Sequence, residues 1–323
     1  MNRIIITGGS GFIGRHLIKK LLSYKRYSVI AVSNTPNISD KYLLDRKLLQ
    51  DSPLKFYVSD VRDGQAILNI FRDEKPDTCI HLAAKISVAD SIKNPNDTMD
   101  INVKGTLNVL ESSHSCDVNN FVFASSAAVY GDVSKLPIAE NTSLRPLSPY
   151  GTSKMLAEEL VIRYSKLNKI QNTAALRIFN VYGPGNANES DVISKFAARL
   201  SKRLPPIIYG DGNHTRDFVS VHDVVEGILL SIKTMESKNN DDINYLPVFN
   251  MGSGNGTSIN ELTRKMIAIS GNELQPIYEK VNQDSGVIMH SYADMTKAKR
   301  DLGFVAKKDI ETGLREIIEQ KND

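Results

Sequence analysis

Apolar and polar positions along the chain follow two different periods. Short runs rich in β-branched and aromatic residues predict buried strands at residues 4–7, 28–32, 56–58, 78–82, 121–124 and 174–178. Longer segments between them carry apolar residues at helical spacing, for example at Met99, Val103, Leu107 and Leu110 and at Leu156, Leu160, Tyr164 and Leu167. Strands that alternate with helices in this order predict an α/β fold with a doubly wound parallel sheet.

The alternation becomes less regular after residue 180. Glycine- and proline-rich breaks follow at residues 182–185, 205–206 and 210–212, so we expect a second lobe to begin here. The expected division gives residues 1–180 to a first lobe, to which residues 214–252 return, and residues 181–213 and 253–323 to a smaller α/β C-terminal lobe. We expect the returning strand at residues 248–250 and a surface loop at residues 237–242. Asp223 is the expected N-cap of an apolar helix.

Composition restricts the kinds of partner that the chain can have. The 323 residues are 41% apolar and 24% charged, as in a soluble globular protein. The 40 basic and 37 acidic side chains give a net charge of +3 without a dense basic segment, which argues against nucleic-acid binding. No apolar stretch has the length of a signal peptide or a membrane span, and neither Cys79, Cys116 nor any histidine has a partner at metal-ligand spacing. We therefore expect a cytoplasmic protein without a metal, a nucleic-acid partner or a membrane anchor.

A glycine-rich turn follows the first predicted strand. Residues 8–14 read Gly-Gly-Ser-Gly-Phe-Ile-Gly, and a helix with an apolar face comes directly after them. Glycines at such a turn allow the backbone to approach a pyrophosphate, and the N-terminus of the helix offers free N–H groups and a positive dipole end. A surface turn would have the same composition, but the strand before it and the helix after it favour a dinucleotide site. Gly9, Gly11 and Gly14 fit one known spacing, and Gly8, Gly11 and Gly14 fit another.

The end of the second predicted strand bears on the choice of dinucleotide. An acidic residue about 20 positions beyond the glycines normally binds the adenosine ribose hydroxyls of NAD. This chain has Ser33 and Asn34 there, with neither a carboxylate nor an arginine that could hold a 2′-phosphate. NAD is the expected cofactor, and NADP stays open.

Three hydroxyl- and amine-bearing residues predict proton-transfer chemistry. Tyr150 and Lys154 stand four residues apart at the start of a predicted helix, so they share one face. A nearby ammonium favours the phenolate of a tyrosine, which could then exchange a proton with a substrate hydroxyl. Ser126 follows the strand at residues 121–124 and can orient the same oxygen. Each feature alone is common in ordinary helices and strand ends, so the argument depends on their combination.

Together these segments resemble the extended short-chain dehydrogenase/reductase family. The resemblance covers nearly the whole chain and rests on Gly8, Gly11 and Gly14, on Ser126, and on Tyr150 with Lys154. It also includes residues 60–61, 81–85, 102–106, 177–184 and 216–219. It implies a Rossmann domain in the first lobe that binds the dinucleotide and a substrate-binding site in the smaller lobe.

The resemblance also implies a role for each matched residue. The expected catalytic residues are Ser126, Tyr150 and Lys154. Lys154 would also bind the nicotinamide ribose, and Ser126 would also bind the substrate. The expected cofactor-binding residues are Gly8, Gly11, Phe12, Ile13, Gly14, Ser33, Asn34, Asp60, Val61, Ala83, Ala84, Lys85, Asn102, Tyr150 and Lys154. Asn180 and Arg216 match positions that contact the nucleotide diphosphate of a sugar donor, and a guanidinium suits a pyrophosphate well. Arg216 could instead form a surface ion pair with Asp217.

The residues after Ser126 distinguish the reaction classes within the family. Dehydratases of this family have a sequence similar to Thr-Asp-Glu here, because elimination of water needs a further acid and base. This chain continues instead with Ala127 and Ala128. The segment is similar to that of sugar 4-epimerases such as those acting on UDP-glucose. One position departs from the pattern: Asp284 stands where such epimerases carry a second phosphate-binding arginine, so the particular nucleotide and sugar stay open.

The sequence is also compatible with two other functions, and it bears on the oligomeric state. The same triad also serves sugar-nucleotide ketoreductases and dehydrogenases, and a regulator that senses NAD(P) without turnover would need only the glycine turn. By resemblance, we also expect a homodimer that pairs the helix near residues 102–111 and the helix after Tyr150. The apolar stripes on these helices are equally compatible with burial inside one subunit.

Overall fold

The computed structural model describes residues 2–24, 26–35, 53–186, 191–237, 248–280 and 288–322. Its larger sheet has seven strands, all parallel, in the order β10-β6-β5-β4-β1-β2-β3. These strands are β1 (Asn2–Thr7), β2 (Tyr27–Ser33), β3 (Leu54–Val58), β4 (Thr78–His81), β5 (Asn120–Ser126), β6 (Asn172–Ile178) and β10 (Val248–Met251). The predicted strands and the doubly wound parallel sheet are confirmed.

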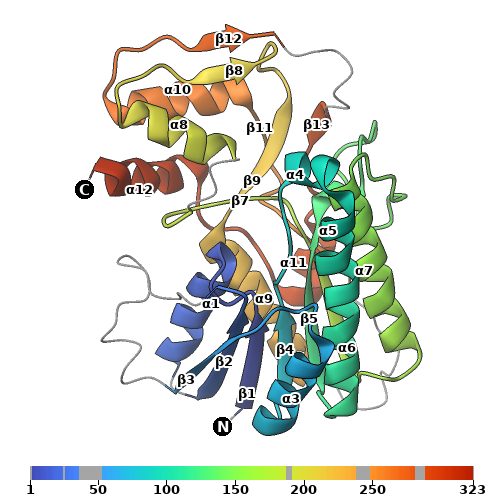
Figure 1. Cartoon of the computed structure of the whole chain (residues 1–323). Helices are drawn as coiled ribbons and strands as arrows, with labels where there is room; N and C mark the ends of the chain where they lie inside the picture. The colour runs from blue at the N-terminus through green and yellow to red at the C-terminus, as the bar shows by residue number, and fades with distance from the viewer. Residues whose placement is uncertain are drawn as a thin grey trace.

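Helices cover both faces of this sheet (Figure 1). One face carries α1 (Phe12–Ser23) and α9 (Val221–Glu236), and the other carries α3 (Gly64–Glu74), α6 (Gly105–Ser115) and α7 (Pro149–Lys166). Ile4 and Ile6 of β1 enter the first core and Ile5 enters the second, as alternation along a strand requires. Burial on both faces explains why the strands are almost continuously apolar.

The segment between β4 and β5 contains a chain of short helices that lead into α6. They are α4 (Val88–Lys93), α5 (Pro95–Met99) and the π-helix η1 (Asp100–Lys104). After β5 a 3₁₀ turn, η2 (Ala127–Val129), leads toward α7. None of the described helices combines the length and the apolar character that crossing a membrane requires.

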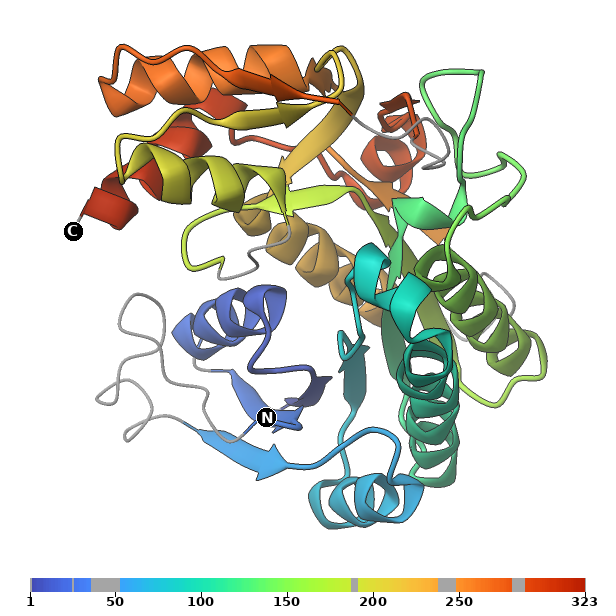
Figure 2. The ribbon, with the colours of Figure 1, turned by 45° about the horizontal axis from the view of Figure 1, so that its top comes forward.

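The smaller lobe has two sheets of its own (Figure 2). In one, β9 (Thr215–Ser220) pairs with β7 (Asn180–Tyr182), β11 (Gly256–Ser258) and β13 (His290–Ser291). In the other, β8 (Ile207–Tyr209) pairs with β12 (Ile277–Glu279). The helices of this lobe are α8 (Val192–Leu200), α10 (Ile259–Ser270) and α12 (Ile310–Asn322), and they share a core that includes Phe196, Leu262 and Leu314.

The chain passes between the two lobes more than once. β10 returns to the larger sheet beside β6, whereas β9 pairs only within the smaller lobe. Ala298 and Leu302 of α11 (Thr296–Leu302) are buried in the core of the larger sheet with residues of α9. The exact division of the chain into two domains stays a prediction. The predicted loop at residues 237–242 lies outside the described residues except for Ser237.

Two local predictions need correction. Ser220, not Asp223, is the N-cap of α9, and its side chain accepts a hydrogen bond from the backbone of His222. Asp223 is buried in the first turn, where its carboxylate accepts from the backbone N–H groups of Lys307 and Lys308. The Asp223 carboxylate of α9 thus anchors the segment before α12.

The apolar stripe predicted on α7 is also only partly buried. Of the predicted residues, Tyr164 is buried and Leu160 packs against the same core, while Leu156 and Leu167 are 42% and 65% exposed. Ala157 and Val161, one position further along, are buried against the sheet instead. The smaller side chain of Ala157 lets the helix lie close to the sheet, which leaves the larger leucines on the outer face.

Candidate active site

The glycine turn joins β1 to α1 and lies against the end of β4. Gly8 has φ +74°, and a Cβ atom there would lie 2.7 Å from the backbone nitrogen of Ala83. A Cβ atom on Gly14 would lie 2.4 Å from the carbonyl oxygen of Gly8. Gly9 differs, because its Cβ would meet chiefly the methyl group of Ala31, which is a side chain. These contacts favour the register on Gly8, Gly11 and Gly14, which stays a prediction.

The N-terminus of α1 is suited to an anion. Gly11 is its N-cap, and no side chain among the described residues caps the helix there. The first N–H groups of a helix, here those of Phe12 and Ile13, have no acceptor within the helix itself, and the helix dipole favours negative charge beside them. A turn that excludes Cβ atoms next to such a helix end fits the pyrophosphate of a dinucleotide.

Hydroxyl groups gather at the end of β2, where an NAD-binding carboxylate would normally stand. The Ser10 and Ser33 hydroxyls form a hydrogen bond with each other, and the Ser10 oxygen lies 2.7 Å from that of Thr35. Ser33 is buried and Asn34 is exposed. The glycine turn and the end of β2 are therefore linked by neutral groups.

The predicted adenine side of the site lies after β3. Asp60 accepts hydrogen bonds from both the backbone and the side chain of Arg62, which hold the pKa of its carboxyl below the usual value. Val61 is buried beside Gly105, where a Cβ atom would come within 2.6 Å of the valine side chain. Arg62 also pairs with Asp97 at 3.2 Å. The loop is therefore fixed in place by side chains of its own and by the start of α6.

The loop after β4 is fastened to α7 through one buried amide. Asn102, in the π-helix η1, accepts a hydrogen bond from the backbone nitrogen of Lys85 at 2.7 Å and donates to the Lys85 carbonyl oxygen at 2.9 Å. It also donates to the Ser153 hydroxyl at 2.8 Å, which in turn donates to the carbonyl of Tyr150. Ala83 and Ala84 lie within this loop, next to the glycine turn. The sequence argument missed Ser153, although its place between Tyr150 and Lys154 was a usable signal.

His81 forms part of the support beneath this loop. Its Nδ1 lies 2.6 Å from the Thr7 hydroxyl and its Nε2 lies 2.9 Å from the Thr106 hydroxyl. Because Thr106 donates to the Asn102 carbonyl, its oxygen is free to accept from Nε2, so Nδ1 accepts from Thr7. Burial lowers the pKa of His81 to about 3, so the ring is neutral. The residue is a core histidine that connects β1, β4 and α6.

The three predicted catalytic residues come together at the carboxyl end of β5. Ser126 ends this strand and lies near enough to Tyr150, in the first turn of α7, to lower the pKa of that tyrosine. Lys154 follows one turn later, 4% exposed, and its Nζ donates to the carbonyl oxygen of Ala124 at 2.8 Å. The side-chain oxygen of Ser148 caps α7 by accepting from the backbone nitrogen of Gly151, which fixes where the helix begins.

Electrostatics at these residues are governed by burial. Burial raises the pKa of Tyr150, and the nearby Ser126 side chain acts in the opposite direction. Burial lowers the pKa of Lys154 to about 7. The Lys154 ammonium also lies 5.0 Å from the centre of the Phe123 ring. Because removal from water disfavours both charged forms, a bound ligand of suitable charge would change both pKa values strongly.

Asn180 and Arg216 lie on neighbouring strands of the smaller lobe. Asn180 pairs with Phe218 in the register of β7 and β9, so its side chain leaves the same face as that of Arg216. The Asn180 amide donates to the Asp217 carbonyl oxygen at 3.1 Å. Among the described residues, no carboxylate lies within ion-pair distance of Arg216, and burial lowers the pKa of its guanidinium.

Asp217 does not form the ion pair with Arg216 that was considered as an alternative. Its buried carboxylate accepts hydrogen bonds from the backbone nitrogens of Ser253, Gly254 and Ala293, at 2.7, 3.0 and 3.1 Å. It thus organises the turn after β10 and the segment that follows β13. Arg216 lies on the opposite side of β9 and donates to the Thr215 carbonyl oxygen at 2.9 Å. Asp284 lies outside the described residues, so its effect on this site stays a prediction.

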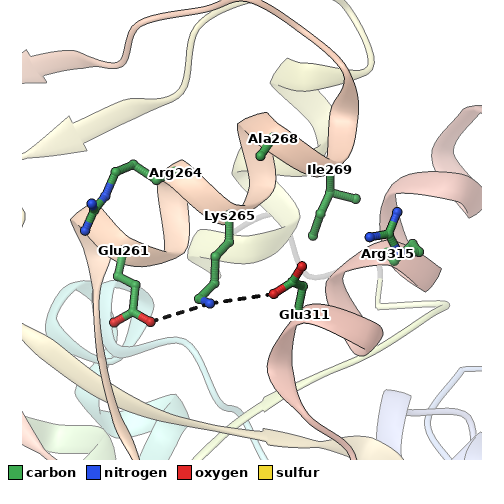
Figure 3. A pocket seen from close by; sticks show the side chains of 7 residues that line it. All are labelled: Glu261, Arg264, Lys265, Ala268, Ile269, Glu311 and Arg315. Carbon is green, nitrogen blue, oxygen red and sulfur yellow. Dashed lines mark ion pairs between the residues drawn. The ribbon is translucent and has the colours of Figure 1, made fainter.

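A hollow lies between α10 and α12, and none of these residues lines it (Figure 3). Its lining includes Arg264, Lys265 and Arg315. Lys265 stands between two carboxylates, 3.7 Å from Glu261 and 3.8 Å from Glu311. Because its central cation is already shared by two acidic groups, this hollow gives no sign of an anion site.

Comparison with known proteins identifies the family. A model of the NAD dependent epimerase/dehydratase family matches residues 4–251, which is most of the chain. The chain belongs to this family. The resemblance predicted from the glycine turn and the Ser126, Tyr150 and Lys154 pattern is thereby confirmed.

Individual members of the family align along nearly their whole length. A putative UDP-glucose 4-epimerase of Methanocaldococcus jannaschii is 38% identical, over 98% of this chain and 97% of that protein. The UDP-glucose 4-epimerase of Thermotoga maritima, whose structure contains UDP-glucose, is 34% identical with a TM-score of 0.87 over 98% of each chain. The UDP-glucose 4-epimerase of Thermus thermophilus, solved in complex with NAD, is 28% identical with a TM-score of 0.85 over 99% of this chain and 98% of that one.

Proposed function

We propose that this member of the epimerase/dehydratase family is an NAD-dependent 4-epimerase of a nucleotide-linked sugar. The observation that carries the proposal is that Ser126, Tyr150 and Lys154 gather at the carboxyl end of β5, with Ser126 near enough to Tyr150 to lower its pKa and Lys154 one turn further along α7. Ala127 and Ala128 follow Ser126, so this segment supplies no acid or base for removing water. Relatives of both similar sequence and similar structure are UDP-glucose 4-epimerases.

The proposed reaction leaves the cofactor unchanged at the end of each cycle. When bound, NAD would accept a hydride from C4 of the sugar and return it to the opposite face of the resulting 4-keto sugar. Tyr150 would take the proton of the C4 hydroxyl at its phenolic oxygen and give it back in the second half of the cycle. Ser126 would share a hydrogen bond with the same hydroxyl and orient it. Lys154 would hold the nicotinamide ribose and favour the phenolate of Tyr150.

The proposed cofactor site follows the ends of the first four strands. The backbone N–H groups of Phe12 and Ile13 would bind the pyrophosphate beside Gly8, Gly11 and Gly14. Asp60 and Val61 would contact the adenine, and the loop at residues 83–85, held by Asn102, would line the path to the nicotinamide. NAD is proposed over NADP because the family is NAD dependent and the hydroxyls at Ser10 and Ser33 offer no cation to a 2′-phosphate.

The proposed substrate is a UDP-sugar, with UDP-glucose and UDP-galactose first. Arg216 supports this because its guanidinium is partly desolvated and, among the described residues, no carboxylate lies within ion-pair distance, the Asp132 carboxylate acting on it only from farther away. A diphosphate would fill that role through paired, charge-assisted hydrogen bonds. Asn180, which lies beside it on β7, would add an amide contact.

The proposed assembly is a homodimer formed through α6 and α7. Leu107 and Leu156, on adjacent helices, are 36% and 42% exposed, and Leu167 is 65% exposed. Light scattering tests this directly: the wild-type chain should have twice the monomer mass, and Leu156→Glu should shift it toward the monomer. Leu204→Glu, at an exposed leucine of the smaller lobe, is the matched control and should leave the mass unchanged.

The function is tested by incubating the purified protein separately with UDP-, dTDP-, GDP- and CDP-linked hexoses. Proton NMR of the anomeric region follows inversion at C4 while absorbance follows the nicotinamide. Inversion of a UDP-hexose without net change of the cofactor is the expected result. Absence of inversion for every donor would refute the proposal, and stoichiometric consumption of added cofactor would replace it with a ketoreductase or dehydrogenase.

A further inference from the structure

A buried ion pair lies beside the proposed catalytic residues and has no part in the proposed chemistry. The side chains of Glu158 on α7 and Arg177 on β6 are 1% and 6% exposed. Arg177 Nη2 lies 2.5 Å from Glu158 Oε1, and its Nε lies 3.1 Å from Oε2. Burying two charges costs free energy that an apolar pair of the same size would not, so stability alone is a weak reason for such a pair.

The geometry around Glu158 gives a stronger reason. The Ser125 hydroxyl, itself buried, donates to Glu158 Oε2 at 2.6 Å. Arg177 Nη1 donates in addition to the Tyr130 hydroxyl at 3.0 Å and to the Glu140 carbonyl at 2.8 Å. One carboxylate therefore joins the end of β5 to α7 and β6, and its partner extends the connection to the segment that follows η2.

Three successive residues of β5 meet three successive turns of α7. The Ala124 carbonyl accepts from Lys154, the Ser125 hydroxyl donates to Glu158, and Ser126 lies near enough to Tyr150 to lower its pKa. Residues 150, 154 and 158 are spaced by four and share one face of the helix. The contact between Ser125 and Glu158 is the one of the three whose side chains the proposed reaction leaves unused.

We propose that Glu158, held by Arg177, is a positioning residue whose hydrogen bond to Ser125 fixes the end of β5 against α7 and so sets the Ser126 and Tyr150 geometry. The inference rests on the proposed epimerase function, because Ser126 and Tyr150 are its reacting pair. A displacement of a reacting group by about 1 Å can cost about 10²-fold in rate, so a rigid clamp next to the pair has kinetic consequences.

The clamp also affects proton transfer. The nearby Ser126 side chain opposes the rise that burial causes in the pKa of Tyr150. If the end of β5 moves away, this effect weakens and the pKa of Tyr150 rises. A smaller fraction of phenolate is then present at a given pH, and activity recovers as the pH is raised.

Ser125→Ala is the decisive variant, because it removes the clamp and keeps the ion pair. Glu158 Oε2 retains Arg177 Nε as a partner, so the carboxylate stays satisfied and the chain is expected to fold. The matched control is Ser231→Ala, which removes another buried hydroxyl whose hydrogen bond, to the Gly227 carbonyl at 2.8 Å, lies within α9. Both variants are compared with the wild-type holoenzyme for kcat, KM, bound NAD and melting temperature.

The Ser125→Ala variant should lose about tenfold in kcat at neutral pH, with its acid limb moved to higher pH and partial recovery at about pH 9. KM for the sugar nucleotide and the bound NAD should stay within about twofold of wild type. Ser231→Ala should keep the wild-type profile. Glu158→Gln should shift the acid limb in the same direction, and if this variant fails to fold, Ser125→Ala decides alone.

If the wild-type enzyme is active and Ser125→Ala keeps the wild-type kcat and pH profile, the inference is overturned, even when the melting temperature falls. That outcome leaves the proposed function intact. A wild-type holoenzyme that inverts no donor sugar overturns the proposed function, and this inference with it.

Discussion

The Nζ atom of Lys154 lies 2.8 Å from the carbonyl oxygen of Ala124, inside the sheet and helix core, and this is its hydrogen bond in the structure. The lysine is thus held by a neutral acceptor, with no carboxylate to balance its charge at that contact. Burial lowers its pKa from 10.5 to about 7. Keeping Lys154 protonated therefore lowers the stability of the folded chain.

This cost should depend on pH. Between about pH 7 and 10.5 the unfolded chain binds a proton at Lys154 that the folded chain lacks, so stability rises with pH in this window. Below about pH 7 the full cost is present. In cofactor-free protein, the free energy of unfolding of Lys154→Met relative to wild type should therefore fall between about pH 6 and about pH 9.

Urea unfolding at these pH values measures the difference. Lys166→Met, at an exposed lysine of the same helix, is the control and should give a difference that stays constant over the range. A constant difference for Lys154→Met would show that its ammonium is not desolvated in the folded chain.

Tyr150→Phe tests the proposed proton transfer. Loss of the phenolic oxygen should reduce kcat by about 10²- to 10⁴-fold, the usual contribution of a positioned acid or base. KM and the bound NAD should change little, because neither depends on the proton. Tyr209→Phe, at a tyrosine that is 53% exposed in the smaller lobe, should retain wild-type kcat. A Tyr150→Phe variant with more than half of the wild-type kcat would remove Tyr150 from the mechanism.

Gly8→Ala tests the cofactor turn. Gly8 and Gly271 both have positive φ, +74° and +68°, but a Cβ atom at Gly8 would strike the backbone of Ala83 whereas nothing lies within 4 Å at Gly271. Gly271→Ala should lower the free energy of unfolding only by the conformational cost of a positive φ, about 1–2 kcal/mol. Gly8→Ala should lose more stability and should copurify without NAD. Equal NAD content in the two variants, measured after denaturation, would contradict the assigned site.

Arg216→Met tests diphosphate binding. A hydrogen bond to a charged group contributes about 1.5–3 kcal/mol, so KM for the UDP-sugar should rise about 10- to 100-fold with NAD content unchanged. The control is Arg264→Met, which removes an exposed arginine on α10 (Figure 3). An unchanged KM in Arg216→Met would show that another residue holds the diphosphate.

Features encoded within a short stretch were predictable. The strand, glycine turn and helix at the N-terminus follow one another directly, so adjacent residues are enough to predict each of them. The spacing of Tyr150 and Lys154 likewise fixes a shared helical face before any tertiary contact is known. The alternation of strands and helices was enough for the parallel sheet.

Features that depend on distant segments were not predictable. Ser125, Glu158 and Arg177 come from two strands and a helix, and only folding brings them together. Asp217 follows Arg216 directly, yet it faces the other side of β9 and binds backbone from residues 253–254 and 293. Asp223 precedes an apolar helix and so resembles an N-cap in the sequence, but Ser220, the last residue of the preceding strand, caps the helix.

In the proposed reaction a hydride leaves C4 of the sugar and returns to the same carbon on its other face. The most direct measurement uses UDP-galactose deuterated at C4, the purified holoenzyme and no added cofactor, with NMR of the product. The proposal predicts UDP-glucose that retains deuterium at C4 in ordinary water, with the bound NAD unchanged at the end. Loss of the label to solvent would contradict it, and no UDP-glucose at all would contradict UDP-galactose as the substrate.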